Sequence, residues 1–212
     1  LERINRMHTP TDIDIYTFKA DHERSLGKGK LGAGLKFSLV ETDNTFDFFN
    51  VVDGEPLLDI DRSNNFVYRE NVNAAYANYS LQLKKWSFQA GLRMEQTNST
   101  GDLTALKETD NDHVERNYLD FFPSASLSFQ PGEKHSFQLS YGRRINRPSY
   151  QDLNPFQNKL DELTFEQGNP FLRPEYTTNI QLTHSFNYRL NTTLSYSHTS
   201  DLITRQTDAG EG

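Results

Sequence analysis

The sequence of 212 residues contains no cysteine, which excludes disulfide bridges and thiolate metal sites. It also contains no run of about 18 apolar residues, which excludes a transmembrane helix. Hydrophobic residues make up only 34% of the chain, which is low for a soluble domain with a thick core. The net charge is -7 and no basic stripe recurs, so nucleic acid is not expected as a partner.

Aromatic residues are plentiful, with 15 phenylalanines and 10 tyrosines, and such a composition is not typical of a disordered chain. Apolar and polar residues alternate in eight segments, as expected for β-strands with one apolar face. These segments are 16–21, 31–39, 74–83, 86–95, 121–129, 135–141, 180–186 and 190–196. Helical spacing fits none of them comparably, and the sequence therefore predicts an all-β chain.

The connections between these segments alternate between short and long. The short ones, which fit tight hairpins, are 27–30, 84–85, 130–134 and 187–189. The long ones are Asn44–Asn64, Asn98–Arg116 and Arg144–Tyr176. In an antiparallel up-and-down meander of about eight strands, all short turns then lie at one end and all long loops at the other. This sorting is typical of a transmembrane β-barrel, whereas a Greek-key sandwich gives no reason for it.

The two faces of the predicted strands differ in the same sense. One carries aromatic and aliphatic side chains with almost no charge, and the other carries mainly Ser, Gln and Gly. We therefore expect Leu35, Phe88, Leu127 and Leu139 to point outward to lipid, around a hydrated lumen. In a soluble meander, the alternative, these side chains would cluster in a dry centre. An aromatic belt is expected near the short turns, formed by Trp86, Phe129, Phe137, Phe186 and Tyr188.

Two segments carry a more specific pattern: SYGRRINRPSYQDLNPF, residues 140–156, and FEQGNPFLRPEYTTNIQL, residues 165–182. They resemble the outer-membrane β-barrel family of TonB-dependent-receptor-like proteins in Gram-negative bacteria, and the match extends over nearly the whole chain. The resemblance implies a closed barrel of roughly 22 strands in the cell outer membrane, preceded by a plug. With about eight strands, no plug and no energy-coupling box, residues 1–212 are expected to form a single internal barrel segment.

The candidate ligand-binding residues lie at the start of the third long connection and are Arg143, Arg144, Arg147, Tyr150 and Asn154. The arginines form a cationic cluster near the expected barrel mouth, which would steer an anionic ligand or clamp a carboxylate or phosphate. A structural alternative is a contact with lipopolysaccharide phosphates or an ion-pair network. The acidic partners in that network would be Asp152, Asp161, Glu162 or Glu175.

Catalytic and metal sites are not indicated. The six histidines have no metal-ligand spacing, the acid-rich loops lack EF-hand spacing, and no nucleophile elbow is present. We therefore expect a non-enzymatic protein without a cofactor. The resemblance implies that it binds an unknown nutrient ligand and imports it with energy from TonB. Two alternatives remain open. One is a non-transporting surface barrel, such as an adhesin or complex partner, and the other is a soluble module that binds carbohydrate through Tyr150 and Phe171.

Overall fold

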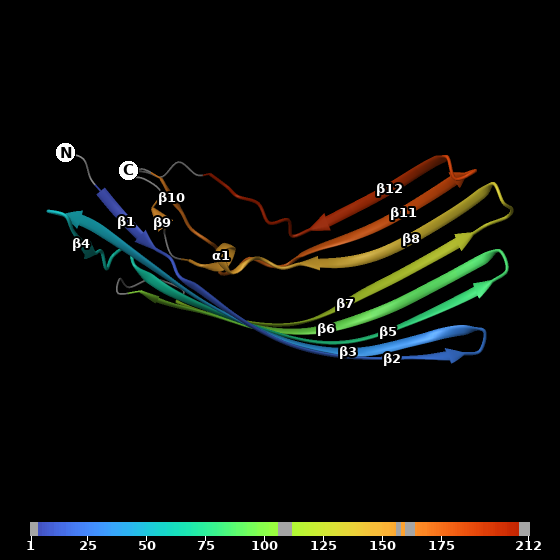
Figure 1. Ribbon diagram of the computed structural model, residues 1–212, viewed down its shortest axis with the longest axis horizontal. Coiled ribbons are helices and arrows are strands. Elements are labelled where there is room, and N and C mark those ends of the chain that lie inside the picture. The colour runs from blue at the N-terminus through green and yellow to red at the C-terminus, as the bar shows by residue number, and fades with distance from the viewer. Residues whose placement is uncertain (1–3, 106–111, 156–157, 160–163, 208–212) are drawn as a thin grey trace.

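The computed structural model describes residues 4–105, 112–155, 158–159 and 164–207, which form one long antiparallel sheet curved like a shell (Figure 1). A short helix, α1 (Tyr150–Leu153), lies on the concave side of the shell. A small strand pair, β9 (Asn158–Lys159) and β10 (Phe165–Glu166), lies on the same side (Figure 1). Within the described ranges, no helix is long and apolar enough to cross a membrane.

The sheet consists of eight rows of strands. Its strands are β1 (Ile4–His8), β2 (Thr11–Leu26), β3 (Gly29–Val52), β4 (Glu55–Leu58), β5 (Asn64–Leu83), β6 (Trp86–Ala105), β7 (His113–Phe129), β8 (His135–Asn146), β11 (Glu175–Phe186) and β12 (Leu190–Ser200). Both β1 and β2 pair with β3 and share one row, whereas β4 and β5 share the row on the other side of β3. The order continues through β6, β7, β8, β11 and β12, with all neighbours antiparallel. The predicted up-and-down meander is therefore confirmed.

The short connections form turns at one end of the sheet (Figure 1). The turn between β2 and β3 contains Gly27 at a φ of 60°, a left-handed conformation that glycine adopts without a steric penalty. The turn between β11 and β12 contains Asn187 and Tyr188 at φ values of 51° and 54°. Two consecutive positive φ values are typical of the hairpin turn whose twist matches that of its flanking strands.

The first long connection, Asn44–Asn64, is mostly strand. β3 continues to Val52 and stays paired with β5 until Phe46 faces Asn64, and β4 then pairs with the end of β3. The prediction of a long loop at this place is therefore wrong. Main-chain pairing continues although apolar residues occur on both faces of this part of β3, Phe46 and Phe48 on one and Phe49 and Val51 on the other, so no single apolar face marks a strand there.

The second long connection, Asn98–Arg116, is shorter than predicted because main-chain pairing continues where both faces of the strands are mostly polar. β6 continues to Ala105 and β7 begins at His113, while residues 106–111 lie outside the described part of the chain. The third long connection leaves the sheet after Asn146 and returns to it at Glu175. It alone carries the backbone away from the wall over a long stretch of described residues.

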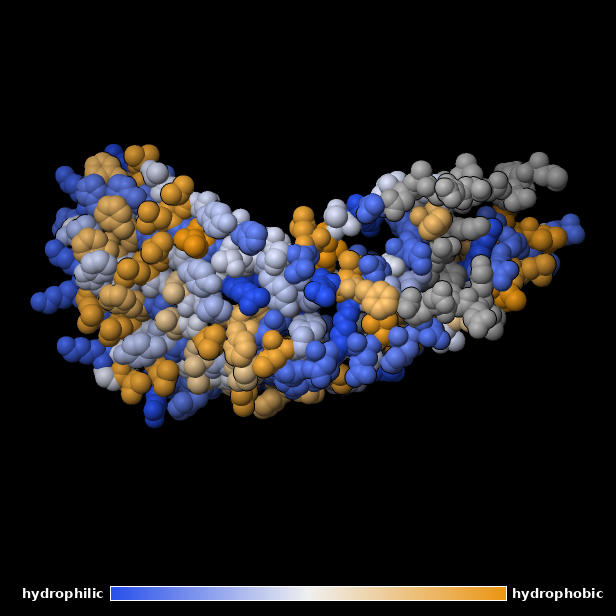
Figure 2. All heavy atoms as spheres, turned by 180° about the vertical axis from the view of Figure 1, so that it is seen from behind, coloured by the Kyte–Doolittle hydropathy of each residue, from blue (hydrophilic) through white to orange (hydrophobic). Residues whose placement is uncertain are grey.

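Apolar side chains lie on the outer face of a single-layer sheet and do not form a dry centre. The exposed fractions of Leu35, Phe88 and Leu139 are 60%, 41% and 44%. Phe88 faces Leu127 across the β6–β7 ladder, and Leu127 faces Leu139 across the next, so these side chains form one row. In Figure 2, hydrophobic side chains gather over the half of the molecule that carries the short turns. The predicted two-faced wall is confirmed, and the dry-centre alternative is wrong.

Aromatic rings gather next to the short turns on this outer face. Trp86 stacks on Phe129 with 4.1 Å between ring centroids, and Phe137 stacks on His184 at 4.5 Å. The register places these four rings side by side on neighbouring strands. His184, the polar exception on the apolar face, thus lies within the aromatic row.

The concave face is lined by small polar residues at one level. Gly32 faces Asn78, Asn78 faces Gly91, Gly91 faces Ser124, and Ser124 faces Gly142. These five strands therefore project little side-chain volume from this row. Such a surface leaves room on the inner side of the wall, as a hydrated lumen requires.

The apolar band of the outer face begins at the short turns and extends to Met94 and Phe121. Farther from the short turns, the outer face becomes charged. Arg69 contacts Glu41 on one neighbouring strand, with 3.0 Å between Nε and Oε2, and Asp102 on the other, with 3.7 Å between Nη1 and Oδ2. The Oδ1 atom of Asp102 lies 2.6 Å from Nδ1 of His113. This four-strand row of charges marks the edge of the surface suited to hydrocarbon.

The pKa of His113 is expected to fall when Asp102 is replaced by asparagine. The hydrogen bond to Asp102, and then its negative charge, raise the pKa of His113 above its ordinary value of 6.5. The contact therefore stabilises the folded state fully at pH values below 6.5, and this stabilisation is lost as the pH rises through the raised pKa of His113. NMR titration of the His113 ring measures this. Glu115→Gln is the control and should lower the pKa less, because Glu115 contributes less to the shift than Asp102. An unchanged pKa in Asp102→Asn would contradict the contact.

Candidate functional site

The connection between β8 and β11 folds back onto the concave face of the wall, and we call its described residues, 147–155, 158–159 and 164–174, the strap. Both motifs that the sequence analysis singled out contribute to the strap. The strap contains α1, β9 and β10 and lies over the inner side of the long strands (Figure 1).

The helix of the strap begins with a capping box. The Ser149 hydroxyl accepts a hydrogen bond from the Asp152 N–H at 3.2 Å, and the Asp152 carboxylate accepts one from the Ser149 N–H at 2.9 Å. Both donors would otherwise lack an intrahelical partner. The helix ends at Asn154, whose N–H donates to the Tyr150 carbonyl at 3.1 Å. The short helix is therefore fixed at both ends by its own sequence.

The two motifs pack against each other. The N–H of Gly168 donates to the Asn154 carbonyl at 2.9 Å, and the N–H of Asn169 donates to the Asp152 carbonyl at 2.8 Å. The Gln167 side chain donates to the Pro155 carbonyl at 2.6 Å. The second motif thus binds the carbonyl groups at the end of α1, and the two motifs form one structural unit.

Gly168→Ala is expected to destabilise this unit by about 2 kcal/mol, because overpacking against main chain forces the backbone to shift. A β-carbon at Gly168 would lie 2.5 Å from the Asn154 carbonyl oxygen and 2.7 Å from that of Asp152. Hydrogen exchange of the Asn169 N–H in the full-length protein measures the loss. Gly132→Ala, in an open turn where nothing lies within 4 Å of an added β-carbon, is the control and should leave the exchange rate unchanged. Equal rates in the two variants would contradict the packing.

An apolar contact anchors one part of the strap to the wall. Leu153 packs against Phe66 of β5 and Leu103 of β6, and all three side chains are buried. Tyr150 and Leu172 pack around them. Phe66 and Leu103 face each other across the β5–β6 ladder, on the same inner face as the polar residues below them. This cluster is an apolar core between the strap and the wall.

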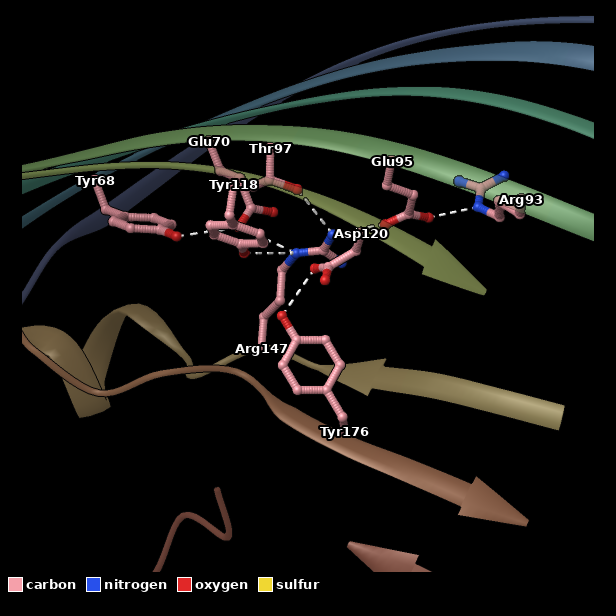
Figure 3. A network of polar contacts seen from close by, with 9 residues as sticks. All are labelled: Tyr68, Glu70, Arg93, Glu95, Thr97, Tyr118, Asp120, Arg147 and Tyr176. Carbon is pink, nitrogen blue, oxygen red and sulfur yellow. Dashed lines mark hydrogen bonds and ion pairs between the residues drawn. The ribbon is translucent and has the colours of Figure 1, made fainter. Parts of the chain in front are cut away.

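A polar contact anchors the start of the strap. Figure 3 shows the Arg147 side chain reaching residues of three neighbouring strands. Its Nη2 atom lies 2.7 Å from Glu95 Oε2 and 3.0 Å from Thr97 Oγ1. Its Nε atom donates to the Tyr118 hydroxyl at 3.3 Å and lies 3.8 Å from Glu70 Oε2. The guanidinium group therefore has hydrogen-bond acceptors on both sides, as a largely desolvated cation requires.

Further contacts hold the carboxylates that receive Arg147. Arg93 Nε forms a short hydrogen bond to Glu95 Oε1, and the Tyr68 hydroxyl donates to Glu70 Oε2 at 3.1 Å. Burial, and then the Glu70 charge, raise the pKa of Tyr68, so its phenol stays protonated and able to donate. The side chains of Arg147 and Glu95 are 22% and 9% exposed, so this ion pair is mostly shielded from water.

The structure places the predicted site residues in different surroundings. The Arg143 guanidinium stacks over the Tyr176 ring, 4.6 Å from its centroid, whereas Arg144 is exposed and Arg147 is held by the wall. Tyr150 packs around the apolar cluster, and Asn154 ends α1. Only Arg144 among the three arginines has an exposed side chain. Ligand binding by these residues stays a prediction.

The partners of Arg147 differ from those expected in an ion-pair network. They are Glu95 and Glu70, whereas Asp152 caps α1. Glu175 accepts hydrogen bonds from the Asn146 side chain at 2.8 Å and the Ile203 N–H at 2.6 Å. The other two expected partners, Asp161 and Glu162, lie outside the described residues.

Sequence reasoning did not identify Glu70, Glu95, Thr97 and Tyr118 as one site. The available signal was charge on a face otherwise rich in Ser and Gln, where Arg93 and Glu95 occur two residues apart. The strand register was needed to bring Glu70 next to Ser99 and Thr97 next to Tyr118.

The junction between strap and wall does not offer a ligand pocket of useful size. Its cavity measures about 10 Å³, which is room for one water molecule. It is lined by Phe66, Tyr68, Ser99, Gly101, Val114, Arg116, Leu153, Pro155 and Pro170. Across the described part of the chain, no group of three His, Cys, Asp or Glu residues is placed to hold a metal ion.

Comparison with known proteins places this fold. The model of a family described as "Outer membrane protein beta-barrel family" matches residues 1–211. No curated protein matches the chain. Among solved structures, the copper transporter OprC has 12% identity and a TM-score of 0.72, with 93% of this chain and 31% of that chain covered. The ferric yersiniabactin uptake receptor FyuA from Yersinia pestis has 13% identity and a TM-score of 0.62, with 94% and 30% covered.

The ferric citrate transporter FecA, in its unliganded form, has 12% identity and a TM-score of 0.64, with 98% of this chain and 30% of that chain covered. The chain thus spans about a third of the length of these structures. At such low identity the likeness concerns the fold, and the curved sheet described above is the fold of a segment of those barrels.

Proposed function

Because the chain belongs to the outer membrane protein beta-barrel family, we propose that it forms part of the wall of a receptor that imports a nutrient with energy from TonB. The observation that carries the proposal is the single-layer wall with an apolar outer face and a polar inner face. An outer-membrane location agrees with that wall and excludes the soluble carbohydrate-binding module.

Both outer edges of the sheet require further strands in this proposal. Ile13 and Ile15 on the edge strand β2 are 55% and 64% exposed, and β12 is exposed along nearly its whole length. Unpaired main-chain groups within hydrocarbon cost several kcal/mol each, so a membrane barrel cannot leave two edges open. The remaining strands of a closed barrel would pair with β2 on one side and with β12 on the other.

The ligand would enter from the end of the barrel opposite the short turns, past the strap. Arg144 is the member of the predicted site that combines an exposed guanidinium with a position at this end. We propose that it contacts an anionic group of the ligand, and that lipopolysaccharide phosphates surround the outer wall. The solved structures with a similar wall are a copper transporter, a ferric citrate transporter and a ferric yersiniabactin uptake receptor. The proposal therefore covers small nutrient ligands in general.

The test is nutrient uptake by cells that depend on the full-length protein. Cells lacking its gene are supplied with single nutrients as the limiting source, and growth is compared with and without a working TonB system. Restored growth that requires both the protein and TonB is expected. Growth that never depends on the protein, together with normal assembly in the outer membrane, would favour the non-transporting surface barrel instead.

A further inference from the structure

One interior strand of the sheet has an edge without a strand partner. β7 pairs with β6 as far as His113, but it pairs with β8 only from Ser124 to Phe129. Within the described ranges, no strand pairs with the β8 side of β7 above Ser124. Unlike β2 and β12, β7 has neighbours on both sides nearer the short turns, so the further barrel strands proposed beside β2 and β12 would not pair with its open edge.

The main-chain groups of this edge point sideways, toward the space that β8 leaves. The Phe121 carbonyl accepts a hydrogen bond from Arg143 Nη1 at 3.2 Å, a contact that a main-chain N–H of β8 would otherwise make. Alternate residues of a strand direct their N–H and C=O groups to the same side. Leu119, Asn117 and Glu115 therefore present their main-chain groups to this side as well. All three are exposed, and Leu119 is 50% exposed.

The described residues of the strap contact β7 from its inner face. These contacts use residues that alternate with those of the open edge. The Tyr118 hydroxyl accepts a hydrogen bond from Arg147, and Arg116 Nη2 donates to the Pro170 carbonyl. The side chains of Arg116 and Tyr118 face inward, because they face Ser99 and Thr97 on the inner face of β6. The strap thus contacts the inner face of β7, whereas the open edge runs along the side of the strand that points away from β6.

We propose that residues Glu115–Leu119 of β7 bind an extended peptide segment of a partner protein, which adds to the wall as a strand. Main-chain donors and acceptors in a regular row recognise an extended backbone and no other common ligand. The exposed side chains specify the partner further. Leu119 favours an apolar side chain opposite it, and Glu115 favours a basic one. This inference does not depend on a transport function, since it needs only the wall and the open edge of β7.

Hydrogen exchange and a probe peptide test the proposal in the full-length protein. The probe is an acetylated, amidated peptide of alternating valine and threonine with a lysine placed to face Glu115. Without the peptide, the Asn117 and Leu119 amide protons should exchange fast while those of Arg116 and Tyr118 exchange slowly. With it, Asn117 and Leu119 should become protected. Protection of both before peptide is added, or none at saturating peptide, would overturn the proposal.

Asn117→Pro provides the matched variant. Proline removes the N–H that faces the open edge and leaves the bonds from β7 to β6 in place. Binding of the probe should weaken about tenfold, as loss of one well-made hydrogen bond predicts. Asn117→Ala is the control, because it loses the side chain that Gln96 contacts but keeps the N–H. The proposal requires that only proline weakens binding while the gel migration of the folded barrel is unchanged. Equal binding by both variants would contradict it.

Discussion

Replacing Arg147 with methionine should release the start of the strap and cost about 3 kcal/mol of local stability, or roughly 150-fold in the equilibrium constant for strap opening. The variant leaves Glu95 mostly shielded from water, with only Arg93 as a cationic neighbour, and it removes the donor to Thr97. Hydrogen exchange of the Gly168 and Asn169 N–H groups in the full-length protein measures the effect. These protons are protected only while the two motifs of the strap stay together.

Arg144→Met is the matched control for this result. It makes the same chemical change three residues away, in an exposed side chain, and should alter stability by no more than about 0.5 kcal/mol. A double-mutant cycle with Glu95→Gln isolates the pair, since the two effects should be less than additive when the groups interact. Equal exchange rates in Arg147→Met and Arg144→Met would show that Arg147 does not anchor the strap.

Leu153→Ala should destabilise the strap by about 3 kcal/mol through loss of its apolar anchor. The side chain is 4% exposed and fills the space between Phe66 and Leu103, so the truncation removes buried apolar surface and leaves a cavity. Exchange of the same two amide protons measures the change. Leu202→Ala is the control, because that leucine is 68% exposed and its truncation should have little effect.

Salt separates the two anchors. Because apolar contacts carry no charge, the effect of Leu153→Ala should be nearly the same at low and at moderate ionic strength. The effect of Arg147→Met should decrease as salt is added, to the extent that water and ions reach the pair. An effect of Leu153→Ala that vanished with added salt would contradict an apolar anchor.

The two anchors together make the strap a fixed part of the inner wall. One anchor is Arg147 at the start of the strap, the other is Leu153 on α1, and both contact residues of β5 and β6. A strap held at both places narrows the inner side of the wall at the end opposite the short turns. At this end Phe171 of the strap and Arg144 of the wall are exposed, and a ligand contact by Arg144 stays a proposal.

Sequence patterns were sufficient for the part of the wall with one apolar face. The alternation of apolar and polar residues around Phe88 and Leu127 identifies both the strand and its outward side, because every second residue there is apolar. The same method missed the upper strands around Thr97 and Ser99, where polar residues occupy both faces and only main-chain pairing defines the strand. Hydrogen bonds of the main chain leave no trace in composition.

The strap anchor was beyond sequence reasoning for a different reason. Arg147 was recognised as a cation that needs a partner, but its partner Glu95 lies 52 residues away in the chain. Local spacing favoured nearby acids such as Asp152, which the capping box uses. A contact between distant strands can be inferred only when the register is known. The motif around Gly168 was identified as specific, yet its role in binding the carbonyl groups at the end of α1 needed coordinates.

The central claim is that the outer face of this wall meets lipid and the inner face meets water. Single cysteines carrying a nitroxide label, placed at Phe88 and Leu139 and at Gln89 and Gln138, test it in the full-length protein in bilayers. The first two labels should collide with dissolved oxygen and be shielded from a water-soluble nickel complex, and the last two should show the reverse. Labels at Phe88 and Leu139 that are open to the nickel complex, with those at Gln89 and Gln138 shielded, would contradict the account.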